Sequence, residues 1–263
     1  MALYVIADLH LSLSDGTDKS MEVFGPRWTD YIDRIRQNWT RLVAPDDTVI
    51  IPGDISWALT LAEAKEDLAF LDSLPGKKIL MKGNHDFWWS SLKKMESFCT
   101  ENGFSTLSFL YHSACIAEDI IVAGTRGWYR EENGDGSNEN AKLVARESLR
   151  LGMALDAAKK LRGTNPRCEI VAFFHYPPVW NGIPCTAFTD PLADAGVRRC
   201  YFGHVHGMSG VCRFSHDGIL YSLISADALG FTPYFIPQEH ICTDSPNAAD
   251  DRPEKSEKTE EKS

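Results

Sequence analysis

The feature that most constrains this chain is a set of short apolar segments that each run directly into a histidine, aspartate or asparagine. Five such segments are rich in β-branched and aromatic residues and are typical of buried strands. In α/β sheets, the crevice beyond the carboxyl ends of the strands is where ligands bind. We therefore expect polar side chains from five strand ends to meet in one place. The segments end on Asp8 and His10, on Gly53-Asp54, on Gly83-Asn84-His85-Asp86, on His175, and on Gly203-His204-Val205-His206.

The order of the other expected elements indicates an α/β fold. Strands and helices alternate over the first hundred residues, which favours parallel strands with flanking helices. Closely spaced strands later in the chain, with a hairpin signal at Asp217-Gly218, indicate a second, mixed sheet. We predict two sheets packed face to face with helices outside. Expected strands cover 2–7, 48–52, 78–81, two or three segments within 104–124, 169–174, 199–202, 211–214 and 219–224; expected helices cover 28–43, 60–74, 91–101 and 140–161.

The residue types at the strand ends suit a metal site. Imidazole, carboxylate and one amide, without thiolate, favour Mn, Fe, Zn or Co over a cysteine-based structural zinc. Asp8 and His10 are two residues apart, so both side chains fall on one side of an extended segment, and His204 and His206 share this spacing. Any one of these residues alone would be an ordinary turn or core residue. Their joint occurrence at strand ends is what indicates a site.

Taken in order, the blocks resemble those of the calcineurin-like metallophosphoesterase superfamily. Its DxH, GD, GNH(D/E), lone H and GHxH motifs correspond to the five segment ends above, and the resemblance covers roughly residues 1–225. It implies a four-layer α/β/β/α sandwich, made of two mixed β-sheets flanked by helices. It also implies a metal-dependent phosphohydrolase that acts on a small phosphomonoester or phosphodiester.

The resemblance further assigns two divalent transition metals, with Mn, Fe and Zn as the candidates, and a hydroxide that bridges them. A carboxylate suits the bridging position, because it has two oxygens and a negative charge. Asp54 would bridge both metals and be essential for catalysis. The remaining ligands would be Asp8, His10 and His206 on the first metal, and Asn84, His175 and His204 on the second.

His85 is the expected general acid. If Asn84 binds a metal, its neighbour His85 is directed elsewhere, and the resemblance implies that His85 protonates the leaving oxygen. An imidazole of ordinary pKa suits this role near neutral pH. Asp86 would either orient His85 or cap the turn, and the sequence does not separate the two.

The second block departs from one branch of the superfamily. Protein serine/threonine phosphatases continue this block as GDxVDRG, whereas the present chain reads Gly53-Asp-Ile-Ser-Trp57. An aspartate that would partner the general acid and an arginine that would bind phosphate are thus missing. The sequence argues against a protein phosphatase.

Candidate substrate-binding residues lie near the ligand blocks. Trp57, Trp88 and Tyr176 could form aromatic walls that stack a base, or they could pack against neighbouring loops. Arg126 and Arg130 could hold phosphate by paired hydrogen bonds, or they could be solvated charges on a loop.

Charge limits the partners. The formal net charge is −10, of which −3 falls in the tail after residue 242, where seven acidic residues outnumber four basic ones. An acidic body is a poor match for long nucleic acid. A small phosphate ester is compatible, because bound cations would reverse the local field. A nucleotide phosphodiesterase, a nuclease, or a non-catalytic metal-binding docking module are the alternatives to a general phosphoesterase, and no protein partner is implied.

The remaining features indicate an ordinary intracellular protein. The seven cysteines occur singly, which fits a reducing compartment. No signal peptide or membrane-spanning stretch is apparent, so a cytoplasmic location is expected. We predict a single domain over 1–242, with a lid-like polar loop at 125–140 and a disordered charged tail at 243–263.

Overall fold

The computed structural model describes residues 1–14, 19–128, 138–210 and 212–237. The first sheet has five strands in the order β13-β1-β2-β3-β4. The first four strands in the chain are parallel, and β13 pairs with β1 in the antiparallel direction. Their bounds are β1 (Leu3–Val5), β2 (Thr48–Pro52), β3 (Lys77–Met81), β4 (Leu107–Phe109) and β13 (Tyr234–Phe235).

The second sheet has six strands in the order β11-β12-β10-β7-β6-β5. Its four central strands are parallel, and an antiparallel strand lies at each edge. The β11–β12 hairpin turns at Asp217 and Gly218, both with positive φ, as the Asp-Gly pair predicts. The strands are β5 (Ala114–Ala117), β6 (Ile120–Thr125), β7 (Glu169–Phe174), β10 (Arg199–Phe202), β11 (Arg213–His216) and β12 (Ile219–Leu223).

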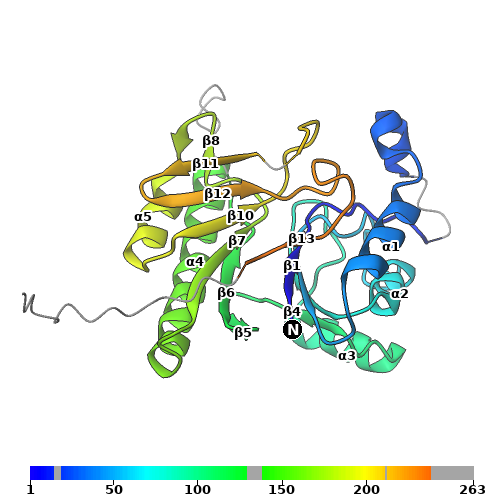
Figure 1. The fold of residues 1–263 in the computed structure, drawn as a ribbon, viewed down its shortest axis with the longest axis horizontal. Coiled ribbons are helices and arrows are strands. Elements are labelled where there is room, and N and C mark those ends of the chain that lie inside the picture. Colours follow the sequence, from blue (N-terminus) through cyan, green and yellow to red (C-terminus); the bar gives the residue numbers. More distant parts are fainter. Residues whose placement is uncertain (15–18, 129–137, 211, 238–263) are drawn as a thin grey trace, which may run out of the picture.

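Helices cover the outer face of each sheet (Figure 1). Helices α1 (Tyr31–Leu42), α2 (Lys65–Ser73) and α3 (Leu92–Asn102) lie on the side of the first sheet. Helices α4 (Asn138–Thr164) and α5 (Thr186–Asp194) lie on the side of the second. Short 3₁₀ segments η1 (Met21–Phe24) and η2 (Pro26–Trp28) precede α1, and a small ribbon, β8 (Val179–Trp180) with β9 (Ile183–Pro184), follows β7.

Three hydrophobic cores separate the four layers. Along β2, Val49 and Ile51 face α1–α3, whereas Ile50 faces the second sheet, as the two-residue period of a strand requires. The middle core joins Ile50 to Val171 and Phe173 of β7. The third core lies between the second sheet and helices α4 and α5. The predicted α/β/β/α sandwich of two mixed sheets is confirmed.

Some predicted boundaries were wrong. The residues from Thr60 to Glu63 form a turn before α2, although Glu63 N–H donates to Thr60 Oγ1 (3.3 Å) and the Glu63 carboxylate accepts from Leu59 N–H (2.9 Å). These two hydrogen bonds resemble those of a helix N-terminal cap, but they form on a turn that precedes the helix. The predicted polar loop 125–140 is shorter at both ends, because Thr125 belongs to β6 and α4 begins at Asn138. Residues 129–137 and the tail 243–263 lie outside the described residues.

No helix in the described part of the chain is long and apolar enough to cross a membrane. The six cysteines within it, all except Cys242, are free thiols.

Candidate metal centre and active site

The predicted strand ends of both sheets meet at one edge of the sandwich. The segment after β1 is held against the segment after β2, because Asp8 N–H donates to Gly53 O (3.0 Å) and His10 N–H donates to Asp54 O (2.9 Å). The Asp8 carboxylate in turn accepts the N–H of His204, which follows β10 in the other sheet (2.9 Å). These bonds bring the two sheets' strand ends together.

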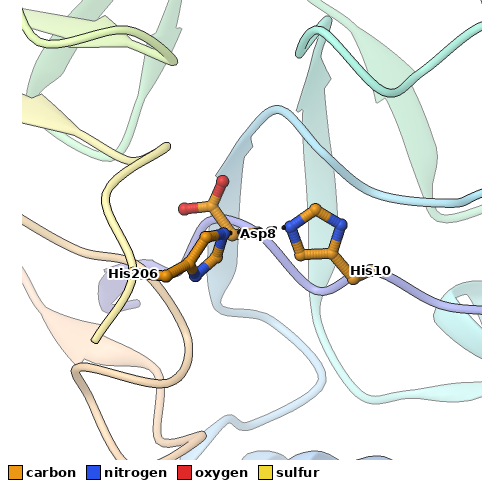
Figure 2. Close-up of side chains that lie close together, drawn as sticks. All are labelled: Asp8, His10 and His206. Carbon is orange, nitrogen blue, oxygen red and sulfur yellow. Dashed lines mark hydrogen bonds between the residues drawn. The ribbon is translucent and has the colours of Figure 1, made fainter. Parts of the chain in front are cut away.

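The first group of candidate ligands consists of Asp8, His10 and His206 (Figure 2). One ligand atom from each lies within 4.8 Å of the others. The Nε2 atoms of His10 and His206 are 3.2 Å apart. Asp8 and His10 are buried, and both come from the segment after β1.

The second group consists of Asp54, His175 and His204, again with ligand atoms within 4.8 Å of one another. Asn84 adds an amide oxygen to it, because its Oδ1 lies 2.6 Å from His175 Nε2. These residues follow β2 and β3 of the first sheet and β7 and β10 of the second, so a pair of parallel strands from each sheet contributes to one group.

Asp54 lies between the two groups. Its Oδ2 is 3.8 Å from His10 Nε2 and 3.4 Å from His175 Nε2, and these histidines belong to different groups. Its other oxygen, Oδ1, accepts the backbone N–H of His85 (2.8 Å). The carboxylate is therefore fixed by one oxygen and presents the other to both groups.

The backbone at these positions is unusual. Four of the candidate ligands have positive φ, namely Asp8 (60°), His10 (47°), Asp54 (50°) and His204 (68°). Non-glycine residues adopt this region at a cost, and such strain concentrates at functional sites. Two glycines permit the close packing beneath the ligands. A Cβ on Gly83 would clash with Asp54 Oδ1, and one on Gly203 would lie 2.5 Å from Asp8 Oδ2.

Burial shapes the protonation of the site. It raises the pKa of Asp8 to about 7, and the charge of Asp54 adds to the effect. Burial also lowers the pKa of His10 and His175 well below the usual range, and that of His204 to about 3. Three imidazoles are thus neutral at neutral pH, which is the form that binds metal.

The donor set fits divalent cations. Two carboxylates buried side by side raise each other's pKa, and a cation between them would remove that cost. His10 Nε2 faces another imidazole nitrogen, and His10 Nδ1 is buried without a hydrogen-bond partner among the described residues. Neutral imidazoles with carboxylates and an amide oxygen suit the borderline transition metals. Both groups have the composition of a metal site.

The sequence also matches a known family. The model of the calcineurin-like phosphoesterases matches residues 1–208 of the chain. The chain belongs to this family. The family consists of enzymes that use divalent metals to hydrolyse phosphate esters, so this calcineurin-like phosphoesterase is a metal-dependent hydrolase by membership. No curated protein matches this chain in sequence.

Solved structures share the fold at low identity. Phosphopantetheinyl hydrolase (PptH) from Mycobacterium tuberculosis is 14% identical, with a TM-score of 0.50 over 90% of this chain and 96% of that chain. TT1561 from Thermus thermophilus is 9% identical, with a TM-score of 0.51 over 86% and 89% of the two chains. At these identities the likeness establishes a common architecture.

A pocket of about 410 Å³ opens beside the first ligand group of this calcineurin-like phosphoesterase. His10, His85 and His206 line it, together with Trp57 and Trp28. The ring of Trp57 stacks on His10 at 4.9 Å and lies 4.3 Å from the ring of His85. His85 therefore faces open space next to the ligand cluster while its neighbour Asn84 joins the second group.

The predicted substrate-binding residues lie in different environments. Trp57 lines the pocket. Trp88 is only 2% exposed and packs in the core between the first sheet and its helices, which corresponds to the packing alternative. Tyr176 is buried and its ring lies 4.0 Å from that of His204. Arg126 is paired with Glu147, and Arg130 lies outside the described residues.

The structure decides the role of Asp86. Its Oδ1 accepts the N–H of Ile55 (2.9 Å) and of Ser56 (3.2 Å), and its Oδ2 accepts that of Gly83 (2.7 Å). It also accepts the indole N–H of Trp88 at 3.0 Å. Asp86 is fully buried and ties the turn after β3 to the turn after β2. It caps these turns, and its hydrogen bonds within the described part of the chain do not include the His85 ring.

Sequence reasoning missed three residues at the site. Asp227 Oδ1 accepts from His206 Nδ1 at 2.9 Å, and Arg27 and Trp28 line the pocket. Asp227 follows the strand predicted at 219–224, so it occupied a sixth strand end of the same kind. Arg27 and Trp28 carry no such signal, because they come from the long connection before α1.

Proposed function

We propose that this calcineurin-like phosphoesterase uses two metal ions to hydrolyse a small phosphomonoester or phosphodiester. The observation that carries the proposal is the position of Asp54. Its Oδ2 lies 3.8 Å from Nε2 of His10 in the first ligand group and 3.4 Å from Nε2 of His175 in the second. A carboxylate shared between two groups of imidazoles is what a dinuclear centre requires.

The assignment of ligands follows the two groups. Asp8, His10 and His206 would hold the first ion, and Asn84, His175 and His204 the second, with Asp54 contacting both. When bound, two such ions supply an acidified water and positive charge for the phosphate oxygens. The protein's own part is to hold the ligands rigidly, which the buried turns and the Asp8–His204 hydrogen bond support.

His85 is the residue that we assign as proton donor to the leaving group. Its ring lines the pocket beside Trp57, and its backbone N–H is bonded to Asp54, which fixes its position relative to the reacting centre. Burial lowers the pKa of His85 in the free protein, and the charge of Asp54 opposes this effect. A phosphate anion next to the ring would favour its protonated form.

Metal analysis and one substitution test the proposal. Elemental analysis of protein loaded with Mn²⁺ should find two ions per chain. Asp54→Asn should retain the fold, by circular dichroism, and lose hydrolysis of p-nitrophenyl phosphate by at least about a thousandfold. The control is Asp72→Asn, because Asp72 bonds Thr106 at a distance from the ligand groups. Full activity of Asp54→Asn would refute the assignment.

The proposal covers two classes of substrate, phosphomonoesters and phosphodiesters. Comparing rates on p-nitrophenyl and bis-p-nitrophenyl phosphate separates them, and a wider panel should hold nucleotides, cyclic nucleotides and a phosphopantetheinyl ester of the kind named for the Mycobacterium neighbour. That the two ions are Mn, Fe or Zn and that the protein is cytoplasmic are further predictions. A chain with both metals that hydrolyses no phosphoester would favour the docking module instead.

A further inference from the structure

A second pocket, of about 160 Å³, contains a concentration of positive charge around one buried acid. Glu147 of α4 is fully buried, and its Oε1 is approached by three guanidinium groups. Arg150 Nη1 lies 2.7 Å from this oxygen, and both Arg126 Nη2 and Arg146 Nε lie at 3.4 Å. The other oxygen, Oε2, accepts the hydroxyl of Thr125 at 2.7 Å.

The pocket carries more positive than negative charge. Lys82, Arg126 and Arg150 line it, and Glu147 is the single acidic residue among its described lining residues. Arg126 Nε is buried and has no hydrogen-bond partner among the described residues. Buried or half-buried cations that outnumber their counter-charges repel one another, and the cost is removed when a further anion binds. The excess is unexpected in a chain of net charge −10.

The pocket adjoins the candidate metal centre on the side of the second ligand group. Lys82 is two residues before Asn84, so their Cα atoms are at most about 7 Å apart. On the other strand, Arg126 O accepts the N–H of Tyr176, the residue after His175, at 2.9 Å. Two residues that line the cationic pocket thus neighbour candidate ligands of the second group, and the charge of Arg126 acts on His175.

We propose that this pocket binds a second anionic group of the substrate, and that the substrate is a phosphate ester with another phosphate attached a few bonds from the ester. Lys82, Arg126 and Arg150 would contact the second phosphate. The inference rests on the proposed function, because the first phosphate occupies the metal centre. Guanidinium and ammonium groups form strong charge-assisted bonds with phosphate oxygens, which accounts for the excess charge.

If the cations served only to neutralise Glu147, fewer of them would be expected. One buried glutamate requires one or two cations, and a bidentate arginine is sufficient to satisfy it. Here Arg126 and Arg146 approach the same oxygen that Arg150 contacts most closely. Lys82 adds a fourth cation, and the buried Asp86, outside the pocket lining, is the other acid that attracts it. The arginine fork of Arg126 therefore retains donors for a ligand.

The test compares bisphosphates with monophosphates. A series of linear α,ω-diol bisphosphates with two to six carbons is assayed against the matching alkyl monophosphates on metal-loaded protein. We expect the KM of at least one bisphosphate to be about tenfold lower than that of its monophosphate. Lys82→Met and Arg150→Gln should reduce this preference to less than about threefold. The matched control is Arg146→Gln, which also contacts Glu147 but does not line the pocket, and which should keep the preference.

Three results separate the inference from the proposed function. Loss of the preference in Lys82→Met and Arg150→Gln, with Arg146→Gln unchanged, supports the subsite. If wild-type protein hydrolyses both classes with equal KM, the subsite is refuted and the phosphoesterase stands. If metal-loaded protein hydrolyses neither class, the proposed function fails, and the subsite is tested separately by calorimetry with inorganic pyrophosphate on metal-free protein. Pyrophosphate binding that Lys82→Met weakens at least about fivefold, and that Arg146→Gln leaves unchanged, supports the subsite. Absence of pyrophosphate binding refutes the subsite.

Discussion

His206 Nδ1 lies 2.9 Å from Oδ1 of Asp227, and Asp227 Oδ2 also accepts the N–H of Gly207 at 2.9 Å. With its proton on Nδ1, His206 donates to Asp227 and presents Nε2 toward His10. Burial acts to lower the pKa of His206, but the hydrogen bond to Asp227 and the nearby carboxylates outweigh it. Asp227 is therefore a positioning residue for one candidate ligand.

Asp227→Asn should weaken metal binding in the first group. An asparagine preserves the shape but removes the charge that makes the imidazole more basic, and such a loss costs about 10- to 100-fold in affinity. Competition with a fluorescent metal indicator would measure the change for the two ions separately. The second ion should keep its affinity; equal weakening of both would indicate a general structural effect.

Gly83→Ala and Gly203→Ala should each displace a carboxylate. The added methyl groups would fall far inside contact distance of Asp54 Oδ1 and of Asp8 Oδ2, respectively. We expect activity to fall at least about a hundredfold, because misplacement of about 1 Å has that effect. Gly152→Ala in α4 meets no atom within 4 Å and should instead raise the free energy of unfolding by about 0.5–1 kcal/mol. Steady-state kinetics and urea unfolding on all three variants check this.

Asp86→Asn should destabilise the fold. Asp86 accepts four N–H groups with its two oxygens, and an amide in its place would turn a donor toward one of them. A buried donor left unpaired costs about 1–3 kcal/mol. Urea unfolding should report this loss, whereas Asp33→Asn, on the exposed surface of α1, should change the free energy of unfolding by less than about 0.5 kcal/mol.

Alkaline pH should remove the energetic cost of burying the charged Lys78 ammonium. This side chain is fully buried, its ammonium donates to Thr106 Oγ1 (3.0 Å), and burial lowers its pKa to about 8 from 10.5. Between these two values the unfolded chain binds more protons than the folded chain, so the contribution of Lys78 to stability rises with pH. The difference in free energy of unfolding between wild type and Lys78→Met should shift by about 1–3 kcal/mol in favour of wild type from about pH 7.5 to about pH 10. A pH-independent difference would contradict a buried, titrating Lys78.

Chelation should lower the stability of the metal-loaded protein. Ions that bind only the folded state stabilise it by about 2.7 kcal/mol when present at a hundred times their dissociation constant. For a chain of this size, EDTA should lower the melting temperature by about 5–10 °C. The proposal predicts a smaller shift for Asp54→Asn, which has lost a shared ligand. Identical shifts in both proteins would argue against its contact with two ions.

The sequence alone determined the local structure and the chemistry available to it. Short, continuous apolar runs defined strands such as β2 and β7, because a strand that is buried on both faces of its sheet has few positions for polar residues. The sequence also determined which polar side chains follow each strand, and the order of these side chains indicated the family. The hairpin at Asp217-Gly218 followed from backbone preference alone, since both residues accept positive φ.

Only the tertiary structure decided what depends on packing between distant segments. Trp88 and Trp57 are similar in sequence context, yet one lies in the core and the other lines the pocket, because the difference lies in which neighbours cover each ring. The carboxylate of Asp227 reaches His206 across the gap between two strand ends. The cluster around Glu147 likewise joins a helix to the end of β6. Such pairings are set by how the layers stack, and no local pattern of residues encodes that.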